Sequence, residues 1–249
     1  MSRVSQVGFS QRVRIEWLQE AALLVLAGGS REAVKESLTE RLRGKVSIGG
    51  SAERGSREKI ISILSRTWLP DSTHLNPFRM NGLELLPKCT NDQMVAIHWG
   101  MVSATYPFWA NVGEQVGRLL ALQGAVSALQ VQRRIRELLG ERETVSRATR
   151  RVLRSFHDWG VLVETNTKGT YGKAHPIRID DPRTISWLLE AMLLSRALPK
   201  APYRDLAQSH ALFPFQLPFF SVEEFLRQSS RIERLRHGLD MDLVYSIPL

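Results

Sequence analysis

Residues 94–113, near the middle of the chain, contain no Asp, Glu, Lys or Arg. A stretch of this kind must leave water, and about twenty apolar residues are enough for a helix to cross a bilayer. This one includes His98, however, and unpaired polar groups each cost several kcal/mol in lipid. Pro107 is typical of a boundary between two helices, where it occupies the first turn of the second. We therefore expect two buried core helices, at about 91–105 and 107–122, and no membrane partner.

Most of the remaining chain repeats apolar residues at intervals of three and four, which is the period of an amphipathic helix. The predicted fold is mainly α with short β-hairpins, a multi-helix protein that contains a winged helix-turn-helix. Residues 71–90 carry two prolines and a glycine, so we expect a connector there with one docked apolar turn at 83–86. The predicted organisation has four parts: an N-terminal three-helix module at 1–70, the connector and central buried helices at 71–124, the winged helix-turn-helix at 125–180, and a C-terminal helical extension with a terminal β-hairpin at 181–249.

Glycine, proline and serine set the predicted ends of the first three helices. The first helix closes at Gly28, and the second follows Ser30, whose side chain can cap it. The second helix ends at Gly44. Ser56 is the expected cap of the third helix, which stops at Pro70.

A helix-turn-helix followed by a hairpin is predicted for residues 125–180. One helix covers 125–140, and after a short turn Thr144 caps a second helix that runs to about Trp159. The sequence VLVE then predicts a strand, TNTKGTYGK a basic turn, and HPIRI the returning strand. Helix, turn, helix and basic hairpin together indicate a winged helix.

The second of these helices has two distinct faces. At 100° per residue its apolar side chains cluster on one side, and four arginines fall within an arc of about 100° on the other. A charged face is often only a solvated one, and winged helices also serve as protein-interaction modules. We favour DNA binding because these positions have no glutamate partner four residues away on the same face. The four residues are Arg147, Arg150, Arg151 and Arg154.

The charge of the chain points to the same partner. It has 34 Lys and Arg against 25 Asp and Glu, a formal net charge of +9, which favours a polyanion. Residues 125–180 hold eleven of the basic and six of the acidic residues, so they supply five of the nine excess charges. A helix fits the major groove, and a basic hairpin can follow the backbone. We expect contacts with double-stranded DNA from Thr144, Arg147, Arg150, Arg151, Arg154, Lys168, Lys173 and Arg178.

Little in the sequence indicates catalysis. LRGKVSIGGS lacks the pattern of a phosphate-binding loop, the six histidines show no metal-ligand spacing, and Cys89 has no nucleophile context. We interpret His157 and Asp158 as the end of a helix core rather than an acid–base pair. We expect no enzymatic activity, catalytic residue, metal, cofactor or small-molecule substrate. One cysteine cannot form an internal disulfide, which fits a cytoplasmic protein.

The C-terminal part is less clear. Pro182 begins one helix, Ser221 caps another, and two strands follow about a turn at 237–240. Two interpretations stay open: a second, degenerate winged helix, or a helical cap whose aromatic side chains fill a groove of the core. If exposed, the same aromatic segment would be a docking patch for a partner. These aromatic residues are Phe213, Phe215, Phe219 and Phe220.

Four segments follow one another in the order GFSQRVRIEWLQEAALLVLAGGSREAVKESLTERL, SREKIISILSRTW, SATYPFWANVGEQV and VSRATRRVLRSFHDWGVL. This order resembles the BrxA family of bacterial phage-exclusion (BREX) systems. The resemblance covers residues 8–180 and consists of a pattern of elements with loose local similarity. It implies a noncatalytic DNA-binding component whose partners are other defence proteins. This chain is longer than the resemblance leads us to expect, since it continues to residue 249.

Two other functions fit the same residues. The chain could be an assembly subunit of a defence complex, with its helices and C-terminal aromatic residues docked on a partner. It could also be a winged-helix transcriptional repressor, which would be a dimer with one preferred palindromic site.

Overall fold

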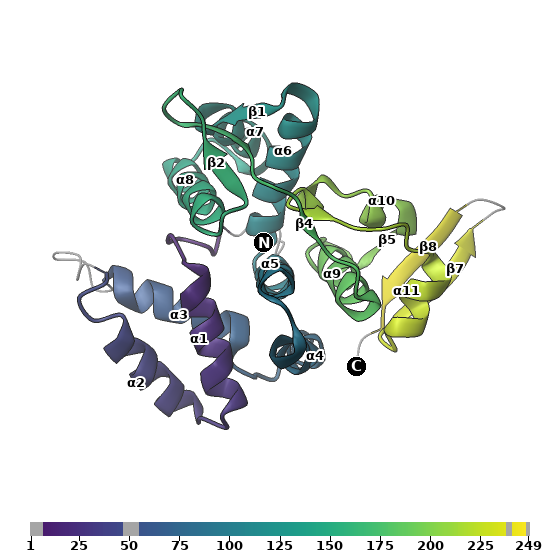
Figure 1. The fold of residues 1–249 in the computed structure, drawn as a ribbon, viewed down its shortest axis with the longest axis horizontal. Helices are drawn as coiled ribbons and strands as arrows, with labels where there is room; N and C mark the ends of the chain where they lie inside the picture. The colour runs from purple at the N-terminus through teal and green to yellow at the C-terminus, as the bar shows by residue number, and fades with distance from the viewer. Residues whose placement is uncertain (1–6, 47–54, 238–240, 248–249) are drawn as a thin grey trace.

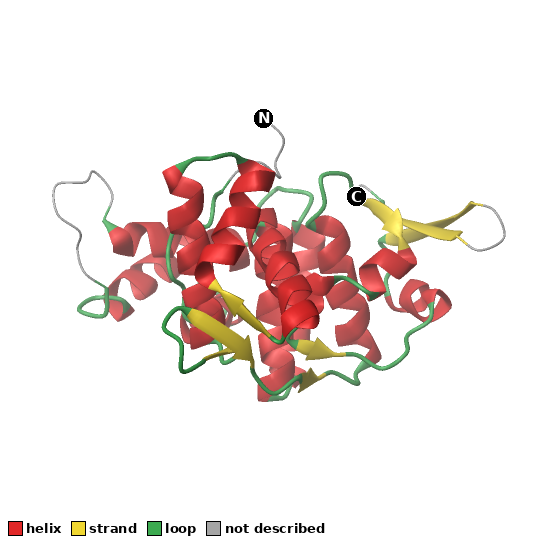
Figure 2. Ribbon diagram, turned by 90° about the horizontal axis from the view of Figure 1, so that it is seen from above, coloured by secondary structure: helices red, strands yellow, loops and turns green. Residues whose placement is uncertain are grey.

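The computed structural model describes residues 7–46, 55–237 and 241–247. Within these residues the fold is mainly helical with three small sheets, in agreement with the prediction of a mainly α protein with short strands. Figure 1 shows α1 to α3 at the lower left, α6 to α8 with short strands above them, and α9 to α11 with β5, β7 and β8 at the right. In Figure 2 the helices fill the middle of the molecule, and the β7–β8 hairpin extends at one end.

The N-terminal module consists of three helices whose ends largely agree with the prediction. Ser30 caps the second, accepting a hydrogen bond from the backbone nitrogen of Ala33 at 3.2 Å. The predicted cap of the third helix is wrong: the helix begins at Ser56 itself, after Gly55, and no side chain caps it. The three helices are α1 (Ile15–Leu26), α2 (Arg31–Arg41) and α3 (Ser56–Trp68).

The predicted connector is more helical than its prolines indicate. Residues 71–90 form two helical segments, with Pro77 in the first turn of one and Pro87 in the other. A proline in the first turn costs no hydrogen bond, because the N–H that it lacks would have had no partner there. The prolines therefore start helical turns instead of interrupting them. The segments are α4 (Asn76–Leu85) and the 3-10 turn η2 (Leu86–Lys88).

The uncharged middle of the chain forms two buried helices, as predicted. They are α5 (Asn91–Thr105) and α6 (Pro107–Gln123), which meet at Tyr106. Thr90 and Gln93 close a reciprocal capping box at the start of α5. In the part of the chain that the structure describes, no helix combines the length and the apolar character needed to span a membrane.

Six consecutive elements, α6, β1, α7, α8, β2 and β3, form a first unit. Its antiparallel sheet has the order β1-β3-β2. The predicted helix over 125–140 is wrong at its start, where three residues form β1 and pair with β3. Ser127 then caps α7, accepting from the backbone nitrogen of Gln130 at 3.1 Å. The bounds are β1 (Ala125–Ser127), α7 (Ala128–Leu139), α8 (Glu143–Asp158), β2 (Leu162–Glu164) and β3 (Thr170–Lys173).

The hairpin of this unit differs from the predicted one in its second strand. The returning strand is β3, which lies inside the stretch predicted as a turn and pairs Lys173 with Leu162. The predicted returning strand is wrong: its residues form β4 (Ile177–Arg178), which pairs in parallel with β6 (Phe215–Gln216). The hairpin is therefore shorter, and the chain leaves it sooner.

The same order of elements recurs in the C-terminal part, which forms a second unit. Helix α9 is followed by β5, α10, α11, β7 and β8, and the antiparallel sheet β5-β8-β7 corresponds to β1-β3-β2. The turn η3 and strand β6 are inserted between α10 and α11. Ser221 caps α11 as predicted, and residues 238–240 of the predicted turn lie outside the described residues. The bounds are α9 (Pro182–Leu194), β5 (Lys200–Pro202), α10 (Tyr203–Ala207), η3 (His210–Leu212), α11 (Val222–Gln228), β7 (Ile232–His237) and β8 (Met241–Ser246).

Buried tryptophans connect both units to α5. The ring of Trp99 lies 5.3 Å from that of Trp109 in α6 and 4.7 Å from that of Phe156 in α8. On the other side, Trp187 of α9 packs so closely on α5 that a Cβ added to Gly100 would lie 2.4 Å from its ring. The buried apolar residues form one continuous cluster.

Candidate nucleic-acid interface

Helix α8 separates apolar from cationic side chains, as predicted. Val145, Val152 and Phe156 are fully buried, because this face packs into the core of the first unit. Arg150 and Arg154 are exposed on the opposite side. Among the described residues, neither of these two arginines has a carboxylate partner. Two unneutralised guanidinium groups therefore stand one helical turn apart.

The expectation that the arginine face lacks a glutamate partner is wrong at one position. Arg147 pairs with Glu143, four residues earlier, at 3.4 Å. Both side chains are more than half exposed, and an exposed i,i+4 pair contributes only about 0.3–0.5 kcal/mol. A phosphate can therefore replace Glu143 at little cost.

The C-terminal half of α8 is attached to the chain's N-terminal segment. Arg151 is only half-exposed and donates a hydrogen bond to the backbone oxygen of Ser10. Burial lowers the pKa of Arg151, and the charges of Arg147 and Arg150 act in the same direction. Arg12 forms an ion pair with Asp158 at the end of the helix. Arg151 is thus partly occupied within the protein and lies at the edge of the free face.

The predicted Thr144 cap is wrong, since α8 begins at Glu143 and follows Arg142 with no side-chain cap. Thr144 is instead an exposed residue of the first turn. A hydroxyl in this place still faces solvent beside the arginines. It keeps the capacity to donate a hydrogen bond to a phosphate.

The other predicted contacts are divided between two places. Lys168 is exposed between β2 and β3, at the tip of the hairpin. Lys173 is at the base, where it lines a pocket with Gly117 of α6 and His210 of η3. Arg178 lies outside the hairpin and pairs with Asp180 at 2.9 Å. The structure therefore leaves Lys168 as the hairpin cation farthest from the body of its sheet.

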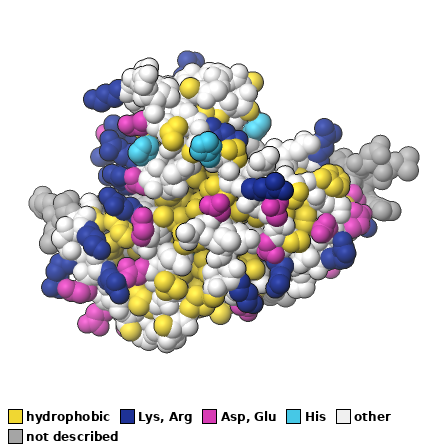
Figure 3. Space-filling model, viewed as in Figure 1, with side chains coloured by type: hydrophobic (Ala, Val, Ile, Leu, Met, Phe, Trp, Pro, Cys, Tyr) yellow, Lys and Arg dark blue, Asp and Glu magenta, His cyan; other side chains and the backbone are white. Residues whose placement is uncertain are grey.

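A basic surface that the sequence analysis missed adjoins α8. A groove of about 650 Å³ lies between α2 and α3 and reaches Ser10 and Tyr106. In Figure 3, Lys and Arg side chains follow the left edge of the molecule from the region of α8 down toward α3 and α2. The helical spacing of the basic residues was a signal that could have indicated this surface. The sequence did not show, however, which faces of the two helices meet. The cations of the groove are Arg31, Lys35, Lys59 and Arg66.

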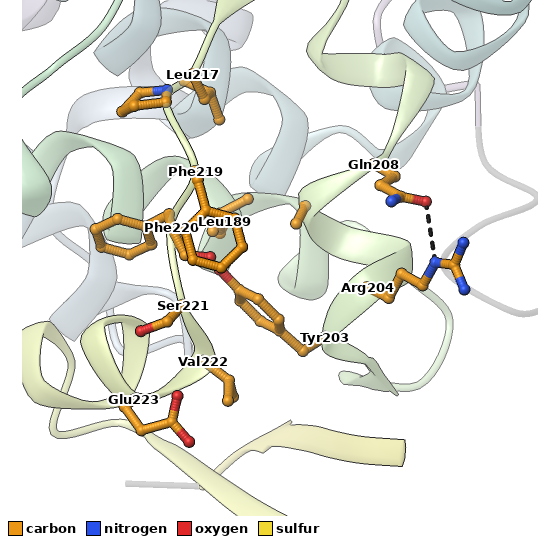
Figure 4. Close-up of a pocket in the computed structure, with 12 residues that line it drawn as sticks. Leu189, Tyr203, Arg204, Gln208, Leu217, Phe219, Phe220, Ser221, Val222 and Glu223 are labelled. Atoms are coloured by element: carbon orange, nitrogen blue, oxygen red, sulfur yellow. Dashed lines mark hydrogen bonds between the residues drawn. The ribbon is translucent and has the colours of Figure 1, made fainter. Parts of the chain in front are cut away.

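The second unit differs from the first in charge. Helix α11, which corresponds to α8, has Glu223 and Glu224 in its first turn. Next to it, an apolar pocket of about 520 Å³ is lined by Tyr203, Leu189 and Phe219 (Figure 4). Phe219 is 93% exposed. The interpretation in which all four C-terminal aromatic residues fill the core, one of those left open, is therefore wrong for Phe219, whereas Phe213, Phe215 and Phe220 are buried.

His98 and Cys89 are titratable groups with structural partners. His98 is fully buried. Its Nδ1 accepts a hydrogen bond from Trp68 Nε1 at 3.1 Å, and its Nε2 lies 2.8 Å from Gln19 Oε1. Burial lowers the pKa of His98 to about 3 and raises that of the half-buried Cys89 thiol to about 11. The imidazole and the thiol are thus neutral at pH 7. Within the described ranges, no three His, Cys, Asp or Glu side chains form a group that could hold a metal ion.

Comparison of the chain with protein-family models found no match. Comparisons with curated proteins and with solved structures also found none. The resemblance of the sequence pattern to the BrxA family therefore stays a prediction.

Proposed function

We propose that this chain is a noncatalytic cytoplasmic protein that binds duplex DNA as a winged helix-turn-helix, with α8 in the major groove and the β2–β3 hairpin along the backbone. The order of its first unit supports this proposal, because a winged helix also has a helix, a strand, two helices and a hairpin whose last strand lies centrally. Helix α8 occupies the place of the recognition helix. The proposal that the chain belongs to a phage-defence system of the BREX kind rests on the sequence resemblance.

The observation that carries the proposal is the pair Arg150 and Arg154, exposed and without carboxylate partners in the described part of the chain. A guanidinium can bind a guanine edge or a phosphate with two parallel hydrogen bonds. Arg147 adds a third cation one turn earlier, since its exposed pair with Glu143 is weak. These three residues form a stripe along α8 at spacings of three and four.

The double variant Arg150→Glu/Arg154→Glu tests the proposal. Titration of a labelled duplex should show that affinity falls at least a hundredfold, and the slope of log affinity against log salt should flatten by roughly two, because about 0.9 counterion is released per phosphate contact. The matched control is Arg183→Glu/Arg227→Glu, which makes the same change in net charge at exposed positions of α9 and α11. Equal losses in both variants would reject α8 as the binding surface.

A specific observation favours assembly on a protein partner as the second candidate function. Phe219 is almost fully exposed beside an apolar pocket, and an exposed aromatic side chain of this kind is typical of interfaces. In that case the partner should co-purify with the chain at high salt, and Phe219→Ser should abolish the association. Duplex affinity would then be absent in the wild-type protein.

A further inference from the structure

Helices α2 and α3 each turn one polar stripe toward the groove between them. On α2 the stripe is Arg31, Lys35 and Thr39, which are four residues apart. On α3 it includes Lys59 and Arg66, which are seven residues apart and so lie on the same face. The groove therefore has cations on both walls along its length.

Two of the cations are held by neighbours, and two are free to meet a ligand. Arg31 donates to the backbone oxygen of Pro70 at 2.6 Å, and the guanidinium of Arg66 lies 5.6 Å from the centre of the Tyr106 ring. Lys35 and Lys59 are exposed and have no carboxylate partner among the described residues.

The acidic residues of the groove do not cancel this charge. The carboxylate of Asp71 already binds the buried guanidinium of Arg79 at 2.9 Å. Burial alone would raise the pKa of Asp71, but hydrogen bonds from Thr73 and Arg79 outweigh it and lower the pKa. Glu58 is the second acid and lies in the first turn of α3. Four cations thus face one carboxylate that lacks a cationic partner in the described residues.

The groove also has a hydroxyl without a partner. Ser65 lines the groove and is 5% exposed, and its Oγ has no hydrogen-bond partner among the described residues. A buried polar atom without a partner is energetically unfavourable, because it has lost its hydrogen bonds to water. Hydroxyl groups beside Lys and Arg are common donors to phosphate oxygens. A phosphate entering the groove would give the hydroxyl an acceptor.

The groove and the α8 arginines share an edge. Ser10 and Tyr106 both line the groove, and the backbone oxygen of Ser10 accepts the hydrogen bond from Arg151. Val13 continues the segment: its nitrogen donates to Ser155 Oγ at 3.0 Å, and its oxygen accepts from Trp159 Nε1 at 3.0 Å. The N-terminal segment therefore fixes the groove beside α8.

We propose that the groove between α2 and α3 is a second DNA site, which binds the phosphodiester backbone of the same duplex beyond the stretch that α8 contacts. Lys35 and Lys59 contact the phosphates, and the hydroxyl groups of the groove add hydrogen bonds. This inference rests on the proposed function, because the groove extends the path of DNA held by α8. The ligand is recognised through its phosphates, by charge and by hydrogen bonds, so the site is insensitive to base sequence.

Two duplexes of different length test the groove apart from α8. One should span about 10 base pairs, a single helical turn, and the other about 20. Wild-type protein should bind the longer duplex more tightly. Lys35→Gln/Lys59→Gln should lower affinity for the longer duplex about tenfold and flatten its salt slope by roughly two, and leave the shorter duplex unaffected. The control Lys88→Gln/Lys200→Gln removes the same charge from exposed positions elsewhere and should change neither duplex.

Acylation of lysines gives a second readout on the unaltered protein. The longer duplex should protect Lys35 and Lys59 from the reagent but not Lys88 or Lys200. The groove proposal is overturned, and the function of α8 stands, if Arg150→Glu/Arg154→Glu abolishes binding while Lys35→Gln/Lys59→Gln binds both duplexes like wild type. The same conclusion follows if the control Lys88→Gln/Lys200→Gln loses as much affinity as Lys35→Gln/Lys59→Gln. If wild-type protein binds neither duplex, both proposals fail.

Discussion

One buried residue, His98, makes the free energy of unfolding depend on pH. Its pKa is lowered to about 3 because burial disfavours the charged imidazolium, whereas in the unfolded chain a histidine titrates near pH 6.5. As pH falls below about 6.5, the unfolded state takes up a proton that the folded state refuses. The free energy of unfolding should therefore decrease on acidification, by on the order of 2 kcal/mol between pH 6.5 and pH 5.

Urea denaturation of the wild-type protein and of His98→Gln at pH 7 and pH 5 would measure this contribution. Glutamine keeps polar atoms near Trp68 and Gln19 but does not titrate. The wild type should lose more stability than the variant between the two pH values. The same loss in both proteins would show that His98 does not cause it.

Among the elements, α3 and α4 are joined by a buried guanidinium. Arg79 is 1% exposed and donates to Asp71 and to the backbone oxygens of Thr67 and Arg66 at the end of α3. Asp71→Asn would leave this buried charge without its carboxylate, so we expect a loss of about 2 kcal/mol, below the 3–5 kcal/mol typical of fully buried pairs because Asp71 is partly solvated. Asp180→Asn, in an exposed pair, should cost less than about 1 kcal/mol.

Chemical denaturation of the two variants provides the comparison, with the unfolding slope checked for a constant value. Similar small losses would mean that solvent, rather than Asp71, balances the Arg79 charge.

Local signals predicted several helix ends correctly, although the caps predicted at Ser56 and Thr144 were wrong. Ser30 and Ser221 cap helices as expected, and Gly44 follows the end of α2. Strand β1 was missed because three residues are too few for a periodic pattern, and their partner in β3 is about forty-five residues away. The sequence 175–179 favours a strand by composition, but its partner is β6, which no local pattern indicates.

The candidate site was predictable to a similar extent. The exposed stripe of Arg150 and Arg154 followed from helical periodicity, which depends only on spacing. The partial cover of Arg151 did not, because Ser10 lies 141 residues earlier in the sequence. The meeting of Lys35 and Lys59 across the groove depends on the packing of α2 against α3, and the two residues are on separate helices. Tertiary contacts, rather than propensity, decided both.

At the scale of the whole molecule, the two units share a core instead of folding separately. Trp187 stacks on Phe78 at 4.2 Å and fills a space left by Gly82 and Gly100, while Trp99 joins α5 to the first unit. We therefore expect thermal unfolding to be one cooperative transition. Calorimetry should give equal calorimetric and van't Hoff enthalpies, and two resolved transitions would contradict this.

The charge difference between residues 1–180 and residues 181–249 has a consequence for encounter with a polyanion. Residues 181–249 contain eight Lys and Arg and eight Asp and Glu, so the entire positive excess belongs to residues 1–180. The centre of charge is displaced from the centre of mass, and the molecule is an electric dipole. In the field of a nucleic acid it would rotate during diffusion so that its arginine side arrives first. The productive orientation is then established before any contact is made. Raising the ionic strength should therefore lower the association rate constant by a larger factor than it raises the dissociation rate constant.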